Sequence, residues 1–262
     1  MITTIKKQLR KKYIERKEII PRICFIHVPK CGGASVSAGF RSSYHWLERL
    51  KRPNFRISLY SAEFAGEQFA LDPNIVRQAA LAHALGISQY KFATGHVYAA
   101  PEVVEHYKDQ WQFVTVMRDP VSRFISNYIY NRYKEKKFYG VNEKTLDEVL
   151  DSPDGQFYGT SFCQYFGAYS DLSHSPSEVY VDTALKNLEN FAAIGFLEDV
   201  QQMEASFSSL TVKPFSLGSY NKSPRPELTE DIRSNSKAMA RIQELCEADQ
   251  KIYDSVRNRS NT

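Results

Sequence analysis

Residues 25–36 read FIHVPKCGGASV, and this stretch joins an apolar strand to a helix through a glycine turn. The preceding run RICFIHV, residues 22–28, predicts a buried strand that ends at Pro29. In the turn, Gly32 and Gly33 can bring backbone N–H groups together around an anion, and Lys30 adds a full positive charge. Helical character over 33–47 places Ser35 in a first turn whose free N–H groups attract anions. The stretch therefore predicts an anion site, with a plain tight strand–helix corner as the alternative.

Strands and helices alternate along the rest of the chain. Further strands are predicted at 56–60, 91–96, 111–117 and 191–196. Helices are predicted at 74–86, 120–136, 145–150, 160–166, 179–190 and 199–209, then a loop over 213–226 and a helical C-terminus from 227 with a break near 234. This order is typical of the α/β class: a single domain, residues 21–262, with a central mainly parallel sheet flanked by helices.

The composition sets broad limits. The 262 residues include 42% apolar and 24% charged side chains, with a net charge of +4, which suits one large folded domain and an anionic ligand. The four cysteines, Cys24, Cys31, Cys163 and Cys246, form no CxxC pair and predict reduced thiols in a cytoplasmic protein. No apolar run approaches the ~20 residues that span a bilayer. A chain trimmed of a Golgi-type anchor is the alternative.

Residues 1–20 form a basic extension. Seven Lys or Arg side chains lie between positions 2 and 18, with Ile2, Ile5, Leu9 and Tyr13 at helical spacing. This pattern predicts either an amphipathic helix that touches a membrane or an anionic polymer, or a solvated helix packed on the domain. Nucleic acid is not an expected partner.

The segment VTVMRDPVSRFISNY, residues 114–128, predicts a second anion site. Arg118 follows a strand, Asp119 and Pro120 begin a helix, and Ser126 lies in the second turn of that helix. The guanidinium and the hydroxyl can converge on one phosphate. Alternatively, Arg118 pairs with a surface carboxylate and Ser126 only packs.

His96 is the candidate general base among six histidines. ATGHVYAAP, residues 93–101, places it just past a strand, at the sheet edge that also carries Lys30, and histidine titrates near neutral pH. The alternative is a histidine hydrogen-bonded in the core or at a helix cap. His27 lies inside the first predicted strand and is interpreted as a core residue. Arg123, Arg132 and Lys134 could meet an acidic sugar or only solvent.

PKCGGAS after a strand, followed further along by MRDPVSRFISNY, resembles the sulfotransferases that depend on 3′-phosphoadenosine 5′-phosphosulfate (PAPS). The resemblance is to the carbohydrate branch with uronyl 2-O-sulfotransferases and their bacterial relatives, and it implies a P-loop-kinase-like sulfotransferase fold. AIGFLED, residues 193–199, and the C-terminal tail are similar to later segments of the family. The family often has Thr where this chain has Cys31 and Ala34, and the resemblance implies that losing the hydroxyl at position 34 removes one possible phosphate contact.

The resemblance implies that Lys30, Cys31, Gly32, Gly33, Ala34 and Ser35 hold the 5′-phosphosulfate. It also implies that Arg118 and Ser126 hold the 3′-phosphate, and that Lys222, Ser223 and Arg225 lie on a loop over the donor. The catalytic residues would be His96 and Lys30, the product would be 3′,5′-adenosine bisphosphate, and no metal would be required. The acceptor would be a glycan hydroxyl, as in polysaccharide biosynthesis.

Two other functions fit parts of the sequence. Lys30 precedes its glycines, so the loop does not match the GxxxxGK[ST] phosphate loop, and no Asp ends an apolar strand in the manner of a metal-binding nucleotide hydrolase. A metal-dependent phosphotransferase with a degenerate phosphate loop is nevertheless one alternative. A non-catalytic module that binds an anionic polymer or a membrane through its N-terminus is the other.

Overall fold

A parallel β-sheet forms the centre of the computed structural model, which describes residues 21–44, 54–134, 141–218 and 225–260. Its strands are β1 (Ile23–Ile26), β2 (Phe55–Arg56), β3 (Phe92–Gly95), β4 (Gln112–Met117) and β5 (Ala193–Phe196). They form one five-stranded sheet in the order β2-β3-β1-β4-β5, and every neighbouring pair is parallel. The central strand β1 leads into the glycine turn, as expected for a P-loop-kinase-like arrangement.

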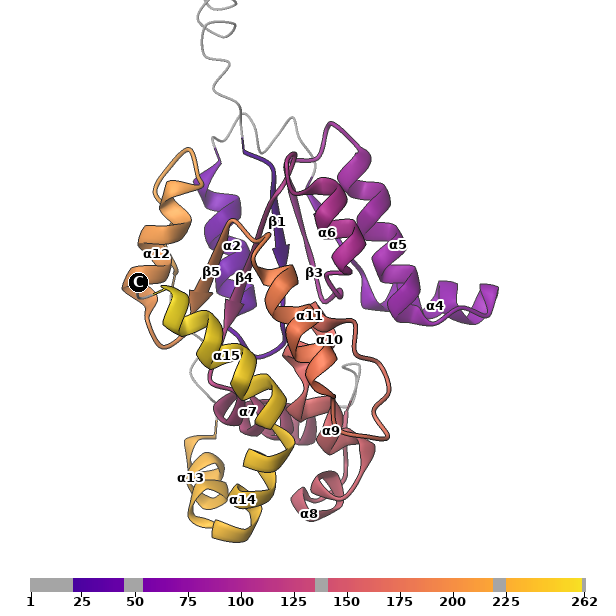
Figure 1. Cartoon of the computed structure of the whole chain (residues 1–262), viewed down its shortest axis with the longest axis vertical. Helices are drawn as coiled ribbons and strands as arrows, with labels where there is room; N and C mark the ends of the chain where they lie inside the picture. Colours follow the sequence, from indigo (N-terminus) through magenta and orange to yellow (C-terminus); the bar gives the residue numbers. More distant parts are fainter. Residues whose placement is uncertain (1–20, 45–53, 135–140, 219–224, 261–262) are drawn as a thin grey trace, which may run out of the picture.

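Helices cover the sheet and extend beyond the carboxyl ends of its strands. They are α2 (Gly33–Ser43), α4 (Leu59–Phe69), α5 (Pro73–Gly86), α6 (Pro101–Tyr107), α7 (Pro120–Tyr133), α8 (Leu146–Leu150), α9 (Pro153–Gly159), α10 (Ser161–Gly167), α11 (Glu178–Leu188), α12 (Val200–Ser209), α13 (Pro226–Ser234), α14 (Ser236–Leu245) and α15 (Glu247–Ser260). In Figure 1 the arrowhead of β1 points toward α7, below which lie α8, α13 and α14. The α/β class is therefore confirmed.

Local sequence signals fix several helix starts. The Asp72 carboxylate accepts a hydrogen bond from the N–H of Asn74 (2.7 Å) at the start of α5, and Pro73 takes the first helical position. Asp119 and Pro120 do the same for α7, where Asp119 accepts from the N–H of Ser122 (2.8 Å). The predicted capping role of Asp119 is confirmed.

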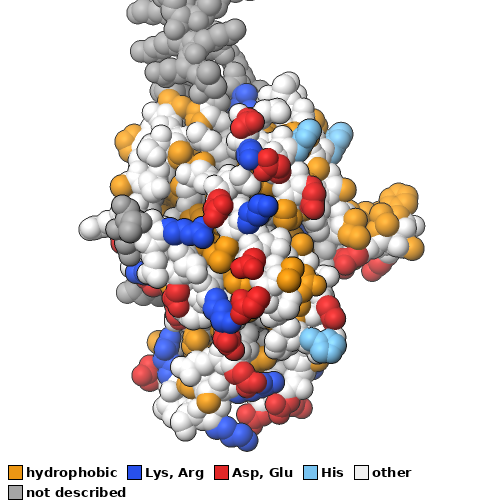
Figure 2. Space-filling model, in the orientation of Figure 1, with side chains coloured by type: hydrophobic (Ala, Val, Ile, Leu, Met, Phe, Trp, Pro, Cys, Tyr) orange, Lys and Arg blue, Asp and Glu red, His pale blue; other side chains and the backbone are white. Residues whose placement is uncertain are grey.

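The segment after Phe55 differs from its prediction. A strand was expected over 56–60, but β2 ends at Arg56 because the Ser58 hydroxyl accepts from the N–H of Ser61 (3.1 Å) and begins α4. Helix α4 packs on the start of α5 at the small residue Gly66, and α4 projects from the body of the molecule while α5 lies beside α6 (Figure 1). Figure 2 shows hydrophobic side chains gathered on this projection. Tyr60 and Phe69 there are 83% and 73% exposed.

Other helices also differ from the sequence patterns. The pattern did not predict the short helices α6 and α9, each of which begins at a proline. The C-terminus has two breaks rather than one: Asn235 caps α14, and Cys246 ends it. Helix α2 ends at Ser43, and residues 45–53 lie outside the described chain, as do residues 1–20 with their predicted basic helix.

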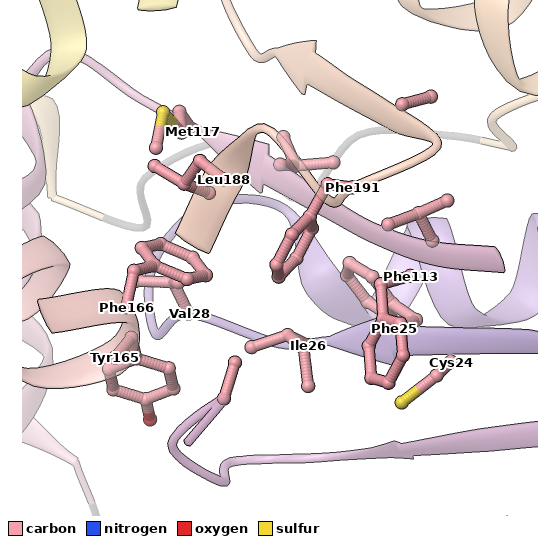
Figure 3. Close-up of a cluster of buried hydrophobic side chains, with 14 of the residues drawn as sticks. Cys24, Phe25, Ile26, Val28, Phe113, Met117, Tyr165, Phe166, Leu188 and Phe191 are labelled. Carbon is pink, nitrogen blue, oxygen red and sulfur yellow. The ribbon is translucent and has the colours of Figure 1, made fainter. Parts of the chain in front are cut away.

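Side chains of β1 fill the core on both faces of the sheet. All four residues of the strand are at most 1% exposed. On one face Phe25 and Phe92 contact Phe40 of α2, with ring centroids 6.1 and 6.0 Å apart. Figure 3 shows the cluster that includes Phe166 and Phe191, whose rings meet edge to face at 5.5 Å. A strand buried on both faces explains the uninterrupted apolar run in its sequence.

A buried ion pair fixes α7 to the C-terminal helix. Arg123 and Asp249 are both 0% exposed, and their charged groups lie 3.5 Å apart. Arg123 also donates to the Ser161 hydroxyl (2.7 Å), while Asp249 accepts from the N–H groups of Phe162 (2.8 Å) and Cys163 (3.0 Å). The interpretation of Arg123 as a contact for an acidic sugar is therefore wrong, because its guanidinium is enclosed by protein.

The four cysteines are buried free thiols, in agreement with their prediction as reduced residues. Cys31 and Cys24 lie on the glycine turn and on β1, respectively. Among the helices of the described residues, none combines the length and the apolar character that crossing a bilayer requires.

Candidate functional site

The glycine turn connects β1 to α2 through two residues with a positive φ. Gly32 adopts a left-handed conformation (φ 74°), and Lys30 also has a positive φ of 67°. For a lysine this conformation costs about 1–2 kcal/mol, and strain of this kind concentrates at functional sites. Gly32 occupies the N-cap position of α2 without a side-chain cap. The first N–H groups of the helix therefore have no capping side chain and can bind an anion.

Arg118 meets this turn directly. It follows β4, and its Nη1 donates a hydrogen bond to the carbonyl oxygen of Lys30 over 3.3 Å. The preceding strands are adjacent and parallel, with Ile26 in register with Thr115, so both segments leave the same sheet edge. The structure thus brings Lys30 and Arg118 together, and no ion pair joins either of them to a carboxylate in the described part of the chain.

Lys30 lies on an aromatic side chain of α7. Its Nζ is 3.8 Å from the centre of the Tyr130 ring, and the Lys134 ammonium is 5.1 Å from the same ring. Burial, followed by the positive charges of Arg118 and Lys134, lowers the pKa of Lys30 to about 8. The three positive charges repel one another, so a bound anion would stabilise the cluster.

Ser126 lies one helical turn before Tyr130 on α7. Residues four apart share a face of a helix, so Ser126 lies on the face that meets Lys30 and is partly exposed there. Tyr130 was not among the predicted site residues. Its spacing of four residues from Ser126 indicated that both share a face of the helix, but the sequence did not reveal that the Tyr130 ring would contact the Lys30 ammonium.

Cys31, Ala34 and Ser35 contribute differently to the turn. The Cys31 side chain is 1% exposed, its Sγ contacts the carbonyl oxygen of Pro29 (3.7 Å), and burial raises the pKa of its thiol to about 12. Only its backbone can therefore meet an anion. Ala34 is exposed and Ser35 partly exposed in the first turn of α2.

The C-terminal candidates fall partly outside the described residues. Lys222 and Ser223 lie outside them, so their contacts to a donor stay a prediction. Arg225 is exposed at the start of α13, and its guanidinium carbon lies 4.6 Å from the centre of the Tyr133 ring of α7. Tyr133 and Tyr130 both lie in the last turn of α7. Arg225 is therefore at the end of α7 where Tyr130 contacts Lys30.

His96 lies just past β3, at the same sheet edge. Its Nδ1 is 2.8 Å from the backbone carbonyl oxygen of His27. Because a carbonyl can only accept, we assign the proton to Nδ1, which leaves the lone pair of Nε2 free to take a proton. Burial lowers the pKa of His96; the His27 hydrogen bond acts against that shift, and the charges of Arg77 and Arg56 add to it. The imidazole is thus neutral at neutral pH, as a general base must be.

Two residues outside the predicted set also shape the site. The Glu198 carboxylate, just after β5, accepts a hydrogen bond from the N–H of Asp119 (2.9 Å) and fixes the corner next to Arg118. His27 does not end up enclosed in the strand: it follows β1, is partly exposed, and its ring centroid lies 4.1 Å from that of His96. In the described residues, no three His, Cys, Asp or Glu side chains come together as metal ligands could.

An α/β protein with two converging cationic strand ends and a neutral histidine beside them is suited to binding a phosphorylated donor and transferring a group from it. No protein-family model matches the chain. The uronyl 2-sulfotransferase of Mus musculus is 26% identical over 113 residues, and that of Homo sapiens is 25% identical over the same length. Each match covers 36% of this chain and 27% of the relative, so the chain matches about a quarter of the length of these curated relatives.

One solved structure, a sulfotransferase from Alicyclobacillus acidocaldarius, aligns with 87% of this chain and 96% of its own length. The TM-score is 0.39 and the sequence identity 14%. The similarity to the two uronyl 2-sulfotransferases is therefore confined to about a third of this chain.

Proposed function

We propose that this protein transfers a sulfuryl group from PAPS to a hydroxyl group of a carbohydrate. The contact between Arg118 and the Lys30 carbonyl carries the proposal, because it unites the two segments that resemble the donor-binding motifs of sulfotransferases. The donor has phosphate groups on both the 3′ and the 5′ side of its ribose, and two adjacent cationic sites match that charge pattern. The similarity to uronyl 2-sulfotransferases supports a carbohydrate acceptor.

The glycine turn would hold the 5′-phosphosulfate. The uncapped N–H groups at the start of α2, the Ser35 hydroxyl and the Lys30 ammonium would meet its oxygens. Arg118 and Ser126 would hold the 3′-phosphate, Arg118 by its planar pair of donors. Lys222, Ser223 and Arg225 would close over the donor from the C-terminal side.

Transfer would proceed in line. The Nε2 of His96 takes the proton from the acceptor hydroxyl, and the acceptor oxygen forms a bond to sulfur. The bond between sulfur and the bridging phosphate oxygen breaks, and that oxygen leaves as part of 3′,5′-adenosine bisphosphate. Lys30 neutralises the charge that develops on this oxygen. A preorganised donor of this kind contributes about 3–4 kcal/mol to the transition state.

The test is transfer of labelled sulfate from PAPS to a panel of neutral and acidic glycans, with products located by mass spectrometry. The proposal predicts a labelled sugar product with PAPS and none when ATP or labelled phosphate donors replace it. A strict preference for ATP together with Mg²⁺ would favour a metal-dependent phosphotransferase instead. Binding to an anionic polymer or to vesicles, with no turnover of any glycan in the panel, would favour a non-catalytic module.

A further inference from the structure

His27 lies between the glycine turn and His96, the proposed general base. Its N–H donates to the carbonyl oxygen of Gly95 (3.1 Å), and its own carbonyl oxygen accepts from His96. Its ring stacks on Phe25 on one side (centroids 5.5 Å apart, planes at 16°) and meets the His96 ring at 4.1 Å. Both the backbone and the side chain of His27 therefore contact the residue to which base chemistry is assigned.

The edge of the same imidazole lies against Gly33, the first residue of α2. A Cβ atom placed on Gly33 would lie 1.7 Å from the Nε2 of His27 and 1.9 Å from its Cδ2. Side chains never approach that closely, so only a glycine is compatible with the ring at this point. The need for the second glycine of the turn thus comes from His27, because of the two glycines only Gly32 has a positive φ.

We propose that His27 is a positioning residue whose ring sets the spacing between Gly33 of the glycine turn and the base His96. The inference rests on the proposed function, since it assigns a role within that site. A ring packed against both groups makes their separation depend on one rigid side chain, and misplacing a reacting group by about 1 Å can lower a rate by about 100-fold. A core histidine that only fills space would not couple the two.

The charge of His27 is consistent with a spacer. Burial, then the charges of His96, Arg56 and Lys30, lowers the pKa of His27 well below its ordinary value. The positive charges of Arg56 on β2 and Arg77 on α5 also lower the pKa of His96. A neutral His27 leaves His96 free to accept the proton of the acceptor, whereas a charged one would oppose it.

The experiment uses His27→Ala, Gly33→Ala and the double variant of the full chain, with His106→Ala on the exposed face of α6 as the control. Binding of 3′,5′-adenosine bisphosphate is measured by calorimetry, and the His96 titration by NMR of its ring proton. Gly33→Ala should weaken binding about 10- to 100-fold, because the new methyl group overlaps the His27 ring. Removing that ring in the double variant should restore binding to near the wild-type value.

Activity should not return with binding. In His27→Ala and in the double variant, water enters the space beside His96, so the pKa of His96 should rise toward its ordinary value while single-turnover transfer stays about 100-fold low. Far-UV circular dichroism and the melting temperature establish that each variant is folded. The inference would be overturned if the double variant bound 3′,5′-adenosine bisphosphate as weakly as Gly33→Ala does. It would also be overturned if the pKa of His96 were the same in His27→Ala as in wild type. If wild type binds no bisphosphate, the proposed function fails, and the His96 titration still decides the role of His27.

Discussion

The Nη1 of Arg118 lies 3.3 Å from the carbonyl oxygen of Lys30, which joins the end of β4 to the turn after β1. The two residues are far apart in the sequence, and the parallel pairing of their strands brings them together. The same carboxyl edge carries His96 after β3 and His27 after β1. A cationic site and a neutral imidazole therefore occupy adjacent positions on a single sheet edge.

Replacing Lys30 should affect chemistry more than donor binding. Lys30→Ala removes the charge that meets the leaving oxygen, so single-turnover transfer should fall about 100- to 1,000-fold. Binding of 3′,5′-adenosine bisphosphate should fall less, because the loop N–H groups remain. The matched control is Lys251→Ala on α15, whose ammonium pairs with Glu178 at the surface. A Lys30→Ala variant that transfers sulfate at the wild-type rate would show that Lys30 does not act on the leaving group.

Replacing His96 should remove base catalysis and leave the donor in place. His96→Ala should lower turnover about 100- to 10,000-fold, the range that a general base contributes. Calorimetry with 3′,5′-adenosine bisphosphate should give nearly the wild-type affinity, because the phosphate contacts come from other residues. His174→Ala, an exposed histidine that contacts Ser173, serves as the control. Retained turnover in His96→Ala would assign the base elsewhere.

The pH profile of kcat/KM for the donor should be bell-shaped. His96 acts in its neutral form and its pKa is lowered, so activity should fall with decreasing pH only below about 6.5. Lys30 acts in its charged form, and its pKa of about 8 predicts a decline as pH rises through that value. In kcat the basic limb should move to higher pH, because bound phosphates favour the charged lysine. An unchanged basic limb in Lys30→Arg, whose side chain does not titrate in this range, would refute this assignment.

The buried pair of Arg123 and Asp249 should dominate the stability of the helices around the site. Arg123→Leu leaves the Asp249 charge buried without its partner, so the free energy of unfolding should decrease by about 3–5 kcal/mol. Arg123→Leu with Asp249→Leu should be less destabilised than the sum of the two single changes. It should stay below wild type, because the N–H groups of Phe162 and Cys163 lose their acceptor.

Urea unfolding measures these changes, with Arg241→Leu in the exposed pair with Glu244 as the control. That control should alter the free energy of unfolding by at most about 1 kcal/mol. An Arg123→Leu variant as stable as the control would contradict the importance of the buried pair.

Local signals in the sequence predicted the parts of the fold that depend on neighbouring residues. The apolar run before Pro29 and the Asp119–Pro120 start of α7 both agree with the structure, because strand burial and helix caps are written into a few adjacent positions. The expected strand at 56–60 failed for a related reason. Ser58 caps α4, and the pattern of apolar residues there gave no sign of that cap.

Features that depend on distant packing could not be predicted in the same way. Arg123 looked like a surface cation because its partner Asp249 comes from the last helix, and only the tertiary fold places that helix against α7. The neighbouring Ser126 was correctly placed on the helix after β4, but Tyr130 under Lys30 was missed. His27 was interpreted as a core residue because it fell inside the predicted strand. Its position against the glycine turn depends on the close approach of Gly33, which the sequence pattern does not show.

The measurement that tests the central claim most directly compares two ligands and two proteins. Wild type and Arg118→Ala are titrated calorimetrically with 3′,5′-adenosine bisphosphate and with adenosine 5′-monophosphate, which lacks the 3′-phosphate. If Arg118 holds that phosphate, wild type prefers the bisphosphate, and Arg118→Ala loses about 10- to 100-fold of this preference, since a charged hydrogen bond contributes about 1.5–3 kcal/mol. Arg118→Ala that binds both ligands as wild type does would contradict the claim that the ends of β1 and β4 hold a single nucleotide.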